Sequence, residues 1–69
     1  MSDEPANLAE VLDYEINRNR ELLDDYRKIP TGGFGASMID LDIRHAVSAL
    51  ASGDVIQILR AYEAMKNNE

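Results

Sequence analysis

Few side chains in this 69-residue sequence have the chemistry of an active site, because cysteine is absent and His45 is the sole histidine. His45 follows Asp42 at a spacing of i, i+3, which places both residues on one side of a helix. Two ligands are too few for a structural metal site, which usually has four. We therefore expect no bound metal and interpret His45 as a residue on the flank of a helix.

The acidic residues come in clusters, among them Asp24 with Asp25 and Asp40 with Asp42. Paired carboxylates do acid–base chemistry when they converge on one substrate, but neighbouring helix residues point about 100° apart. Asp24 also precedes Lys28 by one helical turn, in the order that favours an ion pair. A solvated helix surface explains these residues, so the sequence predicts no catalytic residue, no cofactor and a protein that is not an enzyme.

The formal net charge of −6 argues against direct binding of nucleic acid, which needs a basic surface. The acidity also suggests an alternative function, an acidic inhibitor that mimics DNA in the groove of a nucleic-acid-processing enzyme. Its carboxylates would come from Asp24, Asp25, Asp40 and Asp42. Arginines are interleaved with these acids, however, so no stripe of one sign forms.

The segment PTGGFGAS, residues 30–37, holds three of the four glycines and the single phenylalanine. It lacks both the Gly-x-Gly-x-x-Gly spacing and the Gly-Lys-Ser/Thr ending of nucleotide-binding loops. Phe34 has two interpretations. In the favoured one it folds inward with Met38 as a plug over the end of the helical bundle, and in the other it stays exposed as an anchor in a partner's pocket.

The first helix is expected to begin after Asn7, which has Glu10 at the capping-box position, and to stop before Pro30. Spacings of three and four place one set of residues on a single face of this helix: Leu8, Leu12, Ile16, Asn19, Leu23 and Tyr26.

A second helix is expected to begin after Ser37, with Asp40 in its first turn, and to end at Gly53. Asp54 then caps a third helix after a minimal turn. The apolar faces of these two helices are predicted to contain Ile39, Ile43, Ala46, Val47 and Leu50, then Val55, Ile58, Leu59, Tyr62 and Met65. The predicted fold class is all-α: a long N-terminal helix, a Gly-rich loop and a tight antiparallel helical hairpin.

We expect residues 1–6 to be a disordered arm and residues 7–67 to be a single helical domain. Such a small domain buries too little surface to be very stable alone, and this one has no disulfide or metal to support it. We therefore expect a homodimer whose helices form a larger bundle. The acidic N-terminus is unlike a signal peptide and no apolar run could span a membrane, so we expect a cytoplasmic protein.

Asn19 lies inside the apolar stripe of the first helix, where a polar residue either fixes the register of a helix pair or marks a dip towards solvent. If it is buried, its counterpart in a second copy would be the simplest partner for its amide. The candidate interface for a partner or a second copy is therefore Leu12, Ile16, Asn19, Leu23, Tyr26 and Phe34.

From Ile29 to Lys66 the sequence resembles short uncharacterised proteins encoded by tailed phages and prophages. The points of resemblance are Ile29, Pro30, the glycines around Phe34, and Ser52-Gly53-Asp54. The resemblance implies a phage origin and supplies no activity and no functional residue. The function predicted from the sequence is thus a small acidic helical protein that acts by contact with itself and with an unknown protein, as a phage accessory or assembly factor.

Overall fold

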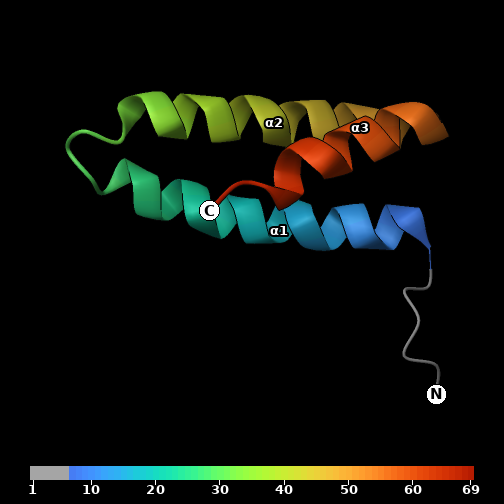
Figure 1. Ribbon diagram of the computed structural model, residues 1–69, viewed down its shortest axis with the longest axis horizontal. Helices are drawn as coiled ribbons and strands as arrows, with labels where there is room; N and C mark the ends of the chain where they lie inside the picture. The colour runs from blue at the N-terminus through green and yellow to red at the C-terminus, as the bar shows by residue number, and fades with distance from the viewer. Residues whose placement is uncertain (1–6) are drawn as a thin grey trace, which may run out of the picture.

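The computed structural model describes residues 7–69, which form three helices: α1 (Leu8–Arg27), α2 (Gly33–Ser52) and α3 (Val55–Lys66). Figure 1 shows α1 and α2 as a long antiparallel pair, with the shorter α3 packed along the half of this pair that contains the start of α1. The predicted all-α class and the three helices are confirmed. The predicted arm, residues 1–6, lies outside the described residues.

The ends of α1 follow from local chemistry. The Asn7 side chain accepts a hydrogen bond from the Glu10 backbone N–H at 2.9 Å, which satisfies one of the orphan donors of the first turn. The helix ends at Arg27, shortly before Pro30. A proline disfavours the helical conformation of the residue before it, so the predicted stop is close to the observed one.

The start of α2 corrects the prediction. The helix begins at Gly33, so five of the eight residues of the expected Gly-rich loop are helical, and Ser37 lies inside the helix rather than at its cap. The Ala36 N–H already donates to the Gly32 carbonyl at 2.8 Å. A Cβ at Gly35 would lie 2.5 Å from Cε2 of the Tyr26 ring, so glycine here allows the first turn of α2 to lie directly against the end of α1.

The turn between α2 and α3 was predicted correctly. Gly53 has a φ of 71°, the left-handed conformation that ends a helix and favours glycine. The next residue, Asp54, accepts hydrogen bonds from the N–H groups of Ile56 and Gln57 at 2.9 and 3.3 Å. The turn is short, so α3 runs back along α2 as an antiparallel neighbour.

One hydrophobic core draws on all three helices. Its buried side chains are Leu12, Ile16, Leu23, Ile39, Ile43, Ala46, Ala49, Ile58, Ala61 and Met65. Three residues predicted for the core are instead exposed: Val47, Val55 and Leu59. Ala49 and Ala61 occupy the contact between α2 and α3, where small side chains let two helices approach closely. The larger side chains Val47, Val55 and Leu59 lie outside this contact, on the solvent side of their helices.

Candidate functional site

Most of the residues predicted for an interface between two copies are buried inside the single chain. Leu12, Ile16 and Leu23 are buried in the chain's own core, and Asn19 has no exposed surface at all. The face of α1 that was expected to meet a partner is therefore covered by α2 and α3 of the same chain.

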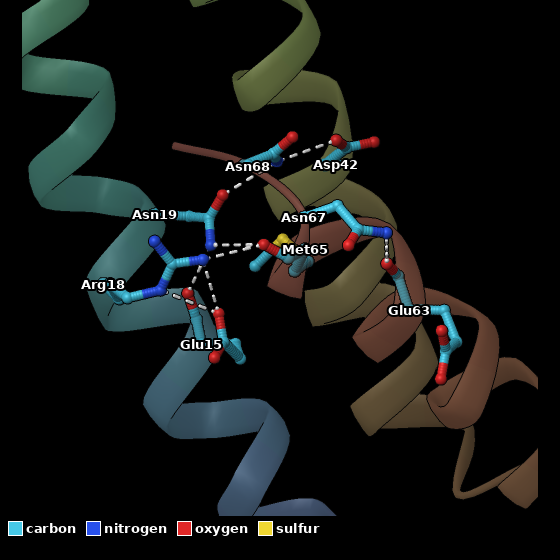
Figure 2. A network of polar contacts seen from close by, with 8 residues as sticks. All are labelled: Glu15, Arg18, Asn19, Asp42, Glu63, Met65, Asn67 and Asn68. Carbon is cyan, nitrogen blue, oxygen red and sulfur yellow. Dashed lines mark hydrogen bonds and ion pairs between the residues drawn. The ribbon is translucent and has the colours of Figure 1, made fainter.

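Asn19 forms hydrogen bonds within the chain rather than with a second copy (Figure 2). Its Nδ2 donates to the Glu15 carbonyl at 2.8 Å and to the Met65 carbonyl at 3.3 Å. Its Oδ1 accepts from Asn68 Nδ2 at 2.9 Å. The interpretation of Asn19 as a dip towards solvent is wrong, and its amide needs no symmetry-related partner.

The neighbours of Asn19 complete a polar network at the end of α3 (Figure 2). Arg18 donates to the Met65 carbonyl at 2.9 Å and pairs with the Glu15 carboxylate at 2.9 Å. Asn68 Nδ2 also donates to Asp42 Oδ2 at 3.0 Å, so the segment after α3 contacts both α1 and α2. The Met65 carbonyl also accepts a hydrogen bond from the backbone N–H of Asn68 at 3.1 Å, so its donors come both from α1 and from the segment after α3. The network thereby fixes where α3 ends on the other two helices.

Tyr26 and Phe34 have different surroundings, although the sequence placed both in one candidate interface. Tyr26 is half-buried against the core, and its hydroxyl donates to the Glu69 carbonyl at 2.7 Å. Phe34 is 80% exposed and Met38 is 46% exposed, so the predicted inward plug is wrong. Because α2 begins earlier than expected, Phe34 is a helical residue about 140° around the axis from the core residue Ile39.

Phe34 belongs to a second stripe on α2 that faces away from the core. The stripe continues through Met38 and Leu41 to His45 at spacings of four, three and four residues. Leu41 is 45% exposed and His45 is also exposed. We call these four residues the outer stripe. The spacing keeps them within about 60° of one another around the helix, as in the apolar seam of a coiled coil.

A groove adjoins the C-terminal end of the outer stripe, between α2 and α3. Its volume is about 260 Å³ and its lining residues are Asp42, His45, Ser48, Ala49, Gln57, Arg60, Ala61 and Ala64. Within residues 7–69 no hydrogen bond joins Asp42 to His45 or His45 to Ser48. Ala49, Ala61 and Ala64 form the apolar part of the lining, and the volume of the groove is about that of one large side chain.

Charge does not divide the molecule into a basic and an acidic end. Arg27 and Lys28, at the end of α1, directly follow Asp24 and Asp25, so the two signs offset each other there. At the opposite end of α2, the one charged residue between Ala46 and Leu59 is Asp54 (Figure 1).

The clustered acids do not act as one group. Asp40 pairs with Arg44 at 3.1 Å, and Asp42 accepts the hydrogen bond from Asn68. Asp24 and Asp25 are exposed on α1. Within residues 7–69 the structure contains no group of three or more His, Asp or Glu side chains that could hold a metal ion. In the same range, no helix is both long enough and apolar enough to cross a membrane.

Comparisons of this chain with family models, with curated proteins and with solved structures found no match. The outer stripe is thus known from the geometry of this chain alone. Sequence reasoning missed Leu41 and the stripe because residues 33–36 were assigned to a loop. The signal was present, since the spacing from Phe34 to His45 is regular once the helix is extended to Gly33.

Proposed function

We propose that this protein is a non-enzymatic interaction module that acts by protein–protein contact and associates with itself as a homodimer. The observation that carries the proposal is the outer stripe, which leaves Phe34 80% exposed on a regular helix. Scattered exposed apolar residues are normal on soluble proteins, whereas a contiguous apolar stripe is typical of an interaction site.

Phe34, the largest side chain of the outer stripe, would contribute most of the binding free energy of such a contact. A fully covered aromatic side chain buries 150–250 Å², so Phe34 offers about 150 Å² of surface to a partner. Aromatic side chains of this kind are enriched among the residues that dominate binding energy. The chain needs no partner to fill its core, so we expect folded monomers in reversible equilibrium with dimers.

A further apolar patch lies on α3, outside the outer stripe. It consists of Val55, Ile56 and Leu59, all exposed and next to the capped start of the helix. We assign to this patch the contact with a different protein, the role that the sequence predicts for an accessory or assembly factor.

Sedimentation equilibrium over a range from about 1 to 500 μM tests self-association, because the mass should rise with concentration towards that of a dimer. Phe34→Ser should weaken the association at least tenfold. Val47→Ser is the matched control, since Val47 is 44% exposed on the same helix but lies on another face. It should leave the association unchanged. A strictly monomeric wild-type chain at 500 μM would refute the proposed homodimer.

A further inference from the structure

We infer that two copies of the chain pair through antiparallel α2 helices, with Phe34 of each copy seated at the mouth of the partner's α2–α3 groove. This inference rests on the proposed homodimer and specifies its geometry. In the antiparallel register, Phe34 faces the partner's His45, and Met38 faces the partner's Leu41. The twofold axis then passes between Met38 and Leu41.

The spacing of the outer stripe supports this arrangement. Residues at intervals of four and three form the seam of helices that pack nearly parallel or antiparallel to one another. From Phe34 to His45 the stripe is about 16 Å long. Its middle consists of Met38 and Leu41, each about half exposed, so the centre of the pairing would be apolar.

The groove supports the placement of Phe34. On α2 its lining runs from Asp42 to Ala49 and includes His45, the residue opposite Phe34 in this register. Ala49, Ala61 and Ala64 form the apolar part of the lining. A volume of about 260 Å³ accommodates one aromatic side chain. A large anchor in a partner's pocket is the usual form of a binding hot spot. The exposed ring and the groove are therefore complementary parts of one contact, which the symmetry of the dimer makes twice.

The position of the groove favours the antiparallel orientation over the parallel one. In a parallel pair each residue of the outer stripe would face its own counterpart, so Phe34 would face Phe34 and neither ring would reach a groove. Only the antiparallel pair brings each ring to the partner's groove. The charged side chains Asp40 and Arg44 pair with each other outside the stripe, which leaves the middle of the seam apolar.

The pairing is expected to be weak and reversible. Two stripes of this length bury less than the roughly 1,600 Å² of a standard interface, a size typical of transient contacts. The dimer should therefore form in the micromolar range.

A charge-swap experiment tests the register. Met38→Glu and Leu41→Lys should each be monomeric at concentrations where the wild type is dimeric. Each substitution would place two like charges, one from each copy, in the apolar seam near the twofold axis. Mixed in equal amounts they should form a heterodimer, with Glu opposite Lys in one layer and the native Leu–Met contact in the other. Sedimentation equilibrium measures the mass, and native mass spectrometry identifies the mixed species. Val47→Glu is the control, which should associate like the wild type.

A cysteine experiment tests the same geometry, and the absence of native cysteine makes it unambiguous. The mixed pair of Phe34→Cys and His45→Cys loses one of its two Phe34 contacts, so the mild oxidation is done at the highest concentration used for sedimentation. There the mixture should give a mixed disulfide dimer, whereas neither variant alone should cross-link efficiently. A mixture that gives no mixed disulfide at this concentration would overturn the inference. In a mixture of Phe34→Cys and Val47→Cys, no mixed dimer should form. Cross-linking of Phe34→Cys with itself would indicate a parallel pair and would overturn the inference.

The outcomes separate the two proposals. A wild-type chain that stays monomeric refutes both. If the wild type associates but Met38→Glu and Leu41→Lys still associate alone, the interface lies elsewhere and only the α2 pairing is refuted. If both variants are monomeric alone and remain so when mixed, α2 is involved but the antiparallel register is wrong.

Discussion

Replacing Asn19 by alanine tests whether the buried polar network at the end of α3 stabilises the fold. Asn19 is fully buried and forms hydrogen bonds to Glu15, Met65 and Asn68. The contacts to Met65 and Asn68 link α1 to residues 46 and 49 positions away in the sequence. They are lost in Asn19→Ala, and the shorter side chain leaves a void in the core.

The magnitude follows from these contacts. The two hydrogen bonds that join α1 to Met65 and Asn68 each contribute about 1 kcal/mol to the free energy of unfolding, and a void of a few atoms costs roughly another 1 kcal/mol. The expected loss is therefore about 3 kcal/mol. For a domain of this size, the total free energy of unfolding is roughly 3–10 kcal/mol, and the melting temperature should fall by about 12–24 °C.

Urea denaturation followed by far-ultraviolet circular dichroism measures this loss. The protein should be dilute, because association would otherwise stabilise the folded state. Asn17→Ala is the matched control: Asn17 lies on the same helix but is exposed, so its replacement should change the free energy of unfolding by less than about 0.5 kcal/mol.

A double-mutant cycle then isolates the contact with Asn68. If the Asn19 and Asn68 side chains interact as the structure indicates, the effects of Asn19→Ala and Asn68→Ala should be non-additive by about 0.5–1.5 kcal/mol. Equal effects of Asn19→Ala and Asn17→Ala would refute the stabilising role of the network. Strict additivity with Asn68→Ala would refute the specific contact between the two amides.

Two further substitutions test the ends of the helices by the same denaturation assay. Gly35→Ala should destabilise the chain by about 1–3 kcal/mol, because the added Cβ would meet the Tyr26 ring. Gly33→Ala is the control, since a Cβ at Gly33 has no neighbour within 4 Å. It should be neutral or stabilise the chain by up to about 0.5 kcal/mol. Equal effects of the two glycine substitutions would show that the Tyr26 contact does not constrain α2. Asp54→Ala should cost about 1 kcal/mol through the lost cap of α3, and an unchanged urea midpoint would contradict the role of this carboxylate.

Much of the fold could be predicted because its signals are local. The side chains of Asn7 and Asp54 and the left-handed glycine Gly53 act within their own turns, so the sequence alone indicates them. The start of α2 could not be predicted in this way. Gly33 and Gly35 are poor helix formers, and they are helical here because the turn packs against Tyr26, a tertiary contact that no local pattern encodes.

In the candidate site, too, the local pattern could be read from the sequence and the tertiary contacts could not. Spacing correctly placed Leu12, Ile16 and Leu23 on one face, but it could not tell whether a second copy or the rest of the chain covers that face. Asn19 was recognised as unusual from its position alone. Its partners come from Met65 and Asn68, and only the path of the chain after α3 brings these residues to it.

The contact between Asn19 and Asn68 also has a consequence for the order of events during synthesis. A ribosome completes α1 and α2 before it makes residues 65–68, so the α1–α2 pair first exists with the Asn19 amide lacking two of its partners. Until then the side of α1 that α3 covers faces water, with Asn19 hydrated, and the apolar core lacks Ile58, Ala61 and Met65. The nascent hairpin should therefore be only marginally stable until the last turn of α3 has been translated. The polar network then forms around Asn19 at the same moment as the core becomes complete.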